Sequence, residues 1–129
     1  MIRLPIAEPG RYYHGRRAIV LRSGMLLEDE RRYLWHELVH ADRNDRACHG
    51  SIAAEVSVER EAARRAMPMS SLLWAFQLEW QRHLVASLLK LPEEWVQFRL
   101  HAAHPAEKNQ LRALHRVRRQ GETDEQESA

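Results

Sequence analysis

The chain has 129 residues, a formal net charge of +2 and hydrophobic residues at 44% of its positions. This length allows one compact unit or one core with a short helical appendage, and the near balance of acidic and basic residues does not indicate a nucleic-acid-binding protein. No apolar run approaches the roughly 20 residues of a membrane helix, and the N-terminal residues lack the apolar stretch of a secretory signal. The single cysteine, Cys48, can form no internal disulfide, which is typical of a reducing cytoplasm.

The N-terminal half is predicted to hold one strand and two helices. An apolar, partly β-branched run within residues 16–25 predicts a strand. Residues 26–43 predict a long helix, because acidic residues occupy the first turn and neither Gly nor Pro interrupts it. Residues 44–51 have the composition of a loop, and a second helix at 52–67 is ended by Pro68.

The C-terminal half is predicted to be helical. Ser70 or Ser71 can cap a helix at 72–90 that is expected to break near Gln81. Pro92 and Pro105 suit the first turns of two further helices. After Gly121 the sequence is acidic and has no apolar anchor, which predicts a disordered tail.

The segment RRYLWHELVHADRND at 31–45 contains His36, Glu37 and His40 on the predicted long helix. Successive helical residues turn by about 100°, so the two imidazoles differ by only about 40° and project side by side. Two imidazoles one turn apart can bind one zinc ion. Glu37 projects about 100° from His36, where its carboxylate can act as a general base. The motif indicates a catalytic metal site; the alternative is a helix whose histidines are merely hydrogen-bonded.

Two histidines do not complete a zinc site, so a third ligand is needed. The extended zincin motif is absent, because Arg43 and Arg46 stand where it has Gly and His. Cys48 and His49 are chemically suitable donors. The ligand types that are usual in catalytic zinc sites favour a loop cysteine and a solvated loop histidine instead.

Glu59 is the preferred third ligand. A helical wheel of the second helix places it in a stripe of alanines, where two helices can approach closely. A carboxylate buried there needs a metal ion or a charged partner such as arginine. Two His from one helix and a Glu from the next form an established catalytic zinc set. Glu55, one turn earlier on the same stripe, is the alternative ligand or a support for the ligands, whereas Glu61 falls on the solvated face.

Two segments resemble the ImmA/IrrE family of metallopeptidases, in particular the short versions of actinobacterial phages and prophages. They are ERRYLWHELVHADR at 30–43 and VEREAARRAMP at 58–68. On this resemblance Glu59 is the zinc-ligand Glu of the family's Glu-x-x-Ala-Asn helix, Ala62 matches its Ala, and Ala63 departs from its Asn. Residues 82–107 are similar to the helical tail of the phage proteins, so the likeness covers about residues 16–115.

The resemblance implies an α+β, mainly α fold. A small zincin-like core at residues 1–68 would pack a short sheet on the two motif-bearing helices, followed by a helical region at 69–120 and the tail at 121–129. The strand at 18–22 is expected to be an edge strand that holds an extended peptide. The group that stabilises the oxyanion stays open among Tyr12, Tyr13, His14 and His49.

The resemblance also implies an activity and a partner. Family members are zinc-dependent endopeptidases that cleave or inactivate a helix-turn-helix repressor and so relieve repression of mobile-element or stress-response genes. For this chain we expect Zn²⁺ as the cofactor, a repressor-type protein as the substrate and the cytoplasm of a bacterial host as the location.

The C-terminal helices offer a rival interpretation. Residues 84–100 have the outline of a helix-turn-helix, whose DNA contacts would be Gln97, Arg99 and the basic residues at 116–119. The second helix begins Pro-Glu-Glu, which repels phosphate, so a packing or substrate-docking role is favoured over DNA binding. A non-proteolytic role, as a protein-binding anti-repressor, is the third possibility. Three tryptophans are predicted to be core residues: Trp74, Trp80 and Trp95.

Overall fold

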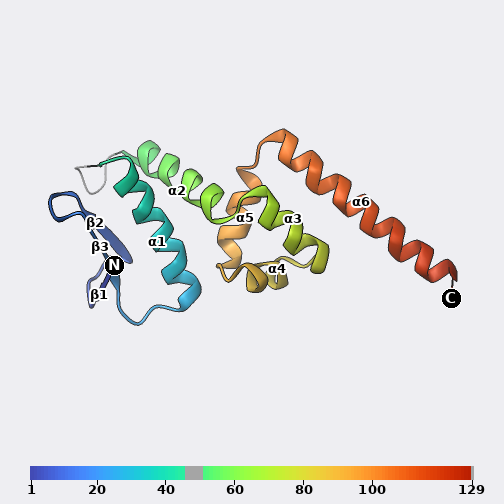
Figure 1. The fold of residues 1–129 in the computed structure, drawn as a ribbon, viewed down its shortest axis with the longest axis horizontal. Coiled ribbons are helices and arrows are strands. Elements are labelled where there is room, and N and C mark those ends of the chain that lie inside the picture. Colours follow the sequence, from blue (N-terminus) through green and yellow to red (C-terminus); the bar gives the residue numbers. More distant parts are fainter. Residues whose placement is uncertain (46–50, 129) are drawn as a thin grey trace.

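The computed structural model describes residues 1–45 and 51–128, with side chains as far as residue 121. It confirms a mainly helical fold with a small sheet (Figure 1). The molecule is elongated, with the sheet at one end and helix α6 projecting from the other, so the two termini lie far apart. The elements are β1 (Ile2–Leu4), β2 (Gly10–Tyr13), a short 3₁₀ helix (His14–Arg16), β3 (Ala18–Arg22), α1 (Leu27–Asp42), α2 (Ile52–Ala66), α3 (Met69–Leu78), α4 (Arg82–Leu89), α5 (Glu93–His101) and α6 (Pro105–Ser128).

The strand predicted at residues 16–25 is present as β3, but the expectation that it lies at an edge is wrong. The strand order is β1-β3-β2, with β1 parallel and β2 antiparallel to the central β3. Val20 and Leu21 of β3 are 6% and 0% exposed, as is typical of a central strand. The two flanking strands have only three and four residues and lie next to Pro5 and Pro9, which hides them from a periodicity search.

Helix α1 packs on β2 and β3, and α2 packs on α1. The α1 residue Val39 is fully buried, as are Ala62 and Ala63 of α2. These small alanine side chains allow a close approach of the two helices, as the alanine stripe predicts. The arrangement brings two glutamates of that stripe into contact with a histidine of α1.

Prolines mark the helix boundaries of the C-terminal region. Pro68 and Pro92 directly precede α3 and α5, and Pro105 opens α6, because proline fits the first turn but not the interior of a helix. Pro68, rather than Ser70 or Ser71, occupies the cap position of α3. The predicted break near Gln81 is confirmed, since α3 ends at Leu78 and α4 begins at Arg82.

One cluster of buried residues extends from α1 and α2 into α3, α4 and α5, across the boundary expected after residue 68, whereas the buried residues of β2 and β3 lie outside it. Trp95 is fully buried in it and Trp80 packs against it. Trp74 is 49% exposed, so its prediction as a core residue is wrong. The backbone of α6 is helical to Ser128, across the acidic segment for which the composition predicts disorder. No described helix is both long and apolar enough to span a bilayer.

Arg99 holds three helices together and is only 1% exposed. Its Nε donates to the Met67 carbonyl at the end of α2, at 2.9 Å. Its Nη1 and Nη2 donate to the Glu107 carboxylate on α6, at 3.0 and 2.9 Å. A guanidinium enclosed in this way cannot reach DNA, so the assignment of Arg99 as a DNA contact is wrong.

Glu107→Gln is expected to lower the free energy of unfolding by about 3 kcal/mol near neutral pH, because it removes the charged partner of a buried guanidinium. The hydrogen bonds from Arg99 outweigh burial and hold the pKa of Glu107 below its usual value. A carboxyl with a lowered pKa stabilises the fold above its unfolded-state pKa, and this contribution is lost as the pH falls through the lower folded-state value. Urea titrations should therefore show the difference between the two proteins shrinking below about pH 4.5. A difference that stays constant in acid would contradict the assignment.

Candidate metal centre

His36 and His40 project side by side from α1, as their four-residue spacing predicts. Their ring centroids are 4.9 Å apart, and their Nε2 atoms are separated by 3.2 Å. The side chains are only 13% and 7% exposed, so both imidazoles are largely withdrawn from solvent. Two ring nitrogens this close require a shared proton or a shared cation between them.

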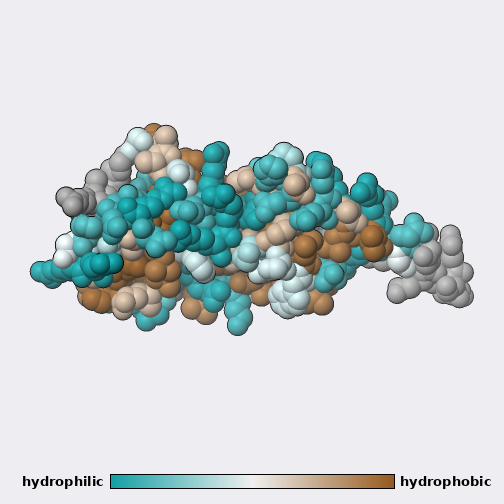
Figure 2. All heavy atoms as spheres, turned by 45° about the horizontal axis from the view of Figure 1, so that its top comes forward, coloured by the Kyte–Doolittle hydropathy of each residue, from teal (hydrophilic) through white to brown (hydrophobic). Residues whose placement is uncertain are grey.

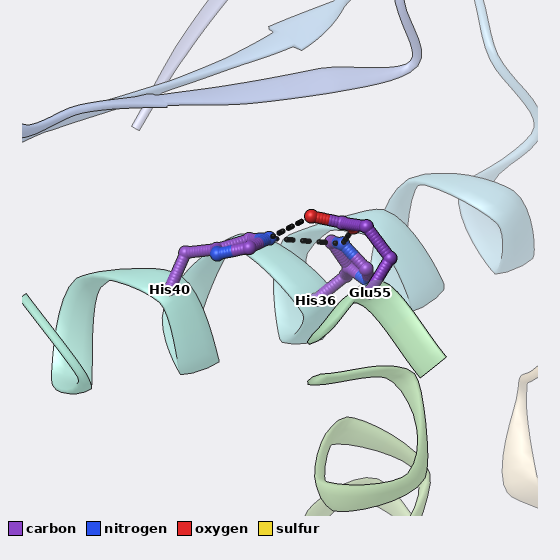
Figure 3. A group of neighbouring side chains, drawn as sticks. All are labelled: His36, His40 and Glu55. Carbon is purple, nitrogen blue, oxygen red and sulfur yellow. Dashed lines mark hydrogen bonds and ion pairs between the residues drawn. The ribbon is translucent and has the colours of Figure 1, made fainter. Parts of the chain in front are cut away.

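Glu55 of α2 closes the group. Its Oε2 lies 3.0 Å from the Nε2 of His36, and its Oε1 lies 3.3 Å from the Nε2 of His40 (Figure 3). Donor atoms at the corners of a tetrahedron with bonds of about 2.0–2.1 Å are about 3.3 Å apart. The three residues thus present two nitrogens and a carboxylate at the spacing of ligands around one metal ion, and they form a group that could hold one.

The opposite nitrogen of each imidazole contacts a second carboxylate. The Nδ1 of His36 lies 2.5 Å from Oε2 of Glu59, and the Nδ1 of His40 lies 2.7 Å from Oδ2 of Asp45. A carboxylate at Nδ1 favours the tautomer with its proton there, which leaves the Nε2 lone pair for a metal. The same pattern on both rings fits metal ligands better than two histidines that are simply hydrogen-bonded.

Negative charge surrounds the two imidazoles. Burial lowers the pKa of His36, but the hydrogen bond to Glu59 and the charges of the nearby glutamates outweigh it and raise the pKa above the usual value. Burial also raises the pKa of Glu59, and the contacts with His36 and Arg32 outweigh it, so the net pKa is lowered. Glu59 is therefore ionised at neutral pH. A histidine pair among ionised carboxylates is an electrostatic environment that favours a divalent cation.

Glu59 is not the carboxylate that faces both histidines. Its Oε2 contacts the far side of His36, and its Oε1 accepts a hydrogen bond from Arg32 Nε at 3.1 Å. The roles expected for the two glutamates are therefore exchanged. Glu55 joins His36 and His40 in the group that could hold a metal ion, and Glu59 contacts the opposite nitrogen of His36. A helical wheel gives the angle of a side chain around the axis, whereas the turn of α2 that meets the histidines depends on how the two helices cross.

Glu61 lies on the outer face of α2, as the wheel predicts. It pairs with Arg43 at 3.0 Å and with Arg65 at 3.3 Å. Among the described residues, Asp45 is the site residue that sequence reasoning misses. The sequence gives only a weak indication of this role, since Asp45 is an acidic residue just past the end of α1 and five positions after His40. Cys48 and His49, the alternative ligands, lie outside the described residues.

Glu37 projects from α1 toward the edge strand β2. It is 4% exposed, and its Cγ and Oε1 would lie 3.1 and 3.5 Å from a Cβ added to Gly10. Gly10 therefore leaves the space that the Glu37 side chain occupies. The charge of Glu37 also contributes to the raised pKa of His36, so the carboxylate lies near the histidine pair.

The oxyanion candidates lie on and after β2. Tyr12 is 7% exposed and shares the α1-facing side of the strand with Gly10, since alternate strand residues share a face. Tyr13 is 38% exposed, with the Arg11 guanidinium over its ring. The rings of His14 and Tyr12 form a T-shaped pair with their centroids 6.1 Å apart. The fourth candidate, His49, lies outside the described residues.

Comparison of the chain with family models, with curated proteins and with solved structures found no match. The geometry of the site therefore carries the functional argument for this chain.

Proposed function

We propose that this protein is a zinc-dependent endopeptidase. The observation that carries the proposal is the convergence of His36, His40 and Glu55, with a carboxylate behind each imidazole. Catalytic zinc sites have three protein ligands, commonly two His and one Glu, and leave a position open for water or substrate. Structural zinc sites are instead closed by four protein ligands, usually including cysteine.

Glu37 is the proposed general base. When bound, zinc would supply a Lewis acid that polarises the scissile carbonyl and favours ionisation of water. Glu37 follows His36 directly on α1 and would accept the proton of the attacking water and pass it to the leaving amine. Its place between α1 and Gly10 restricts the movement of its side chain, which favours a defined position for that transfer.

The substrate strand is proposed to pair with β2. The central β3 has no free edge, so an extended peptide can join the described sheet only along β1 or β2. Of these two strands, β2 packs on α1 and carries Gly10, which adjoins Glu37. Main-chain pairing along β2 would therefore bring a peptide bond toward the general base.

The proposed substrate is a helix-turn-helix repressor of phage or other mobile-element genes, in a bacterial cytoplasm. This part of the proposal rests on the resemblance of residues 30–43 and 58–68 to the ImmA/IrrE metallopeptidases. The DNA-binding interpretation is weaker, because Arg99 is buried and α5 begins with Glu93 and Glu94. The competing proposal is a non-proteolytic anti-repressor. An assay of repressor cleavage distinguishes it from a peptidase.

The metal content of the purified protein tests the centre directly. We expect about one zinc ion per chain by elemental analysis, as for a mononuclear site. Replacing either His36 or His40 by Ala should reduce the zinc content to a small fraction of the wild-type value, because each histidine supplies one of the three ligands. His83→Ala is the matched control, since that histidine is exposed on α4, and it should retain the metal. A metal-free wild-type protein that also fails to take up added zinc would refute the proposal.

A further inference from the structure

A long groove lies between α6 and helices α3, α4 and α5. One hollow of about 510 Å³ is lined by residues from all four helices, and a second of about 340 Å³ adjoins it. The two share four lining residues, so they form one continuous depression, called here the α6 groove: Arg82, Leu100, Leu111 and Arg112. Figure 2 shows apolar atoms gathered among hydrophilic ones in the half of the molecule that holds α3 and α6. This groove lies outside the metal centre.

The floor of the larger hollow is aromatic and aliphatic. The rings of Phe76 and Trp80 meet edge-on with their centroids 5.1 Å apart. Trp80 stacks on His115 with a centroid distance of 4.2 Å and an angle of 24° between the rings. Leu100 and Leu111 complete the floor. A hollow of this size and lining can enclose a bulky apolar side chain and withdraw it from solvent.

The rim of the α6 groove is basic. Arg82, Arg112 and Arg116 line the larger hollow and Lys108 the smaller one, and no carboxylate lines either. Within the part of the chain that the structure describes, neither Arg82 nor Arg116 forms an ion pair. Cations gathered around an apolar floor without counter-charges create a positive potential that attracts an acidic partner.

The α6 side of the groove is one helical face. Lys108, Leu111, Arg112, His115 and Arg116 follow the spacing i, i+3, i+4, i+7, i+8. Eight residues of helix rise about 12 Å, which matches about two turns of a bound helix or four residues of an extended segment. This length fits a short peptide segment better than a single small ion.

From these features we propose that the α6 groove binds an acidic segment of a partner protein that inserts a bulky apolar side chain between α3 and α6. Insofar as this partner is the cleaved repressor, the proposal rests on the proposed function, and the groove is then a docking site remote from the metal centre. Nucleic acid fits less well: the Trp80 ring already contacts His115 and Phe76, so it is not free to stack with bases, and phosphates do not explain an apolar floor.

The test selects random 12-residue phage-displayed peptides on the full chain. Enriched peptides should combine a large apolar residue with Asp or Glu. A fluorescein-labelled selected peptide, followed by anisotropy, should bind Arg112→Glu at least about tenfold more weakly than wild type, because one charge contact becomes repulsive. Arg64→Glu, an exposed α2 arginine outside the groove, is the matched control and should bind like wild type. Changing the acidic residues of the peptide to Lys one at a time should restore binding to Arg112→Glu only at the position that faces residue 112, because the other cations of the groove are unchanged.

Three results would overturn the docking proposal: no enriched peptide, enriched peptides without acidic residues, or equal affinity for wild type and Arg112→Glu. Tight binding of a 20-nucleotide single strand that is lost in Arg112→Glu, with no peptide enriched, would make the groove a nucleic-acid surface instead. Peptide binding is also measured on Glu37→Gln, where it should be unchanged. Failure of the peptidase proposal then appears in the cleavage assay alone, and failure of the docking proposal appears in the anisotropy alone.

Discussion

Glu37→Gln is expected to retain the bound metal and to lose at least about a hundredfold in peptidase activity, the lower end of what a positioned general base contributes. The amide has nearly the same shape as the carboxylate, so it fits the space beside Gly10 that the wild-type side chain occupies. It cannot accept a proton from water, so the loss should be in chemistry rather than in folding. The measurement is the survival of a co-expressed helix-turn-helix repressor, together with the zinc content of the same preparation.

Glu28→Gln is the matched control, because Glu28 is an exposed glutamate in the first turn of α1. It should cleave like wild type. If the repressor disappears equally with Glu37→Gln, or is inactivated without being cut, the chain acts by binding and the anti-repressor interpretation replaces the enzyme. If zinc is lost together with activity, Glu37 supports the metal and is not a dedicated base.

The second large effect expected is on zinc affinity, and it distinguishes the roles of Glu55 and Glu59 on α2. Glu55→Ala should weaken zinc binding by more than the roughly 10- to 100-fold that is typical for residues supporting a ligand, because it removes one of the three donors. Glu59→Ala should fall within that range, because Glu59 orients His36 through Nδ1 and does not face the shared point. Competition with a chromogenic zinc chelator at neutral pH measures the zinc affinity of wild type and of all variants under the same conditions.

Two further variants complete this series. Asp45→Asn should resemble Glu59→Ala, since Asp45 contacts His40 as Glu59 contacts His36. Glu61→Ala should leave the affinity unchanged, since Glu61 pairs with arginines on the outer face of α2. The reverse order, with Glu59→Ala the most damaging, would restore the ligand set predicted by the helical wheel. Equal effects of Glu55→Ala and Glu61→Ala would mean that the carboxylate of α2 is no ligand.

Local sequence signals predict the helical part of this fold well. The breaks at Pro68, Pro92 and Pro105 follow from the covalent geometry of proline, which acts wherever the residue stands. The strand order does not follow from such signals, because pairing joins residues far apart in the chain. Ile2 lies beside Val20 and Tyr12 beside Ile19, and these long-range pairs make β3 the central strand.

The residue pattern is enough to predict that His36 and His40 share one face of a helix, that Glu37 projects about 100° from His36, and that a carboxylate of the next helix turns inward. All three depend on the fixed rotation per residue of an α-helix. The pattern does not predict which carboxylate faces the histidines, the contact of Asp45 with His40, or the basic groove between four helices. These features depend on the crossing of α1 and α2 and on the packing of α6, which are set by contacts between distant residues and leave no periodic trace in the chain.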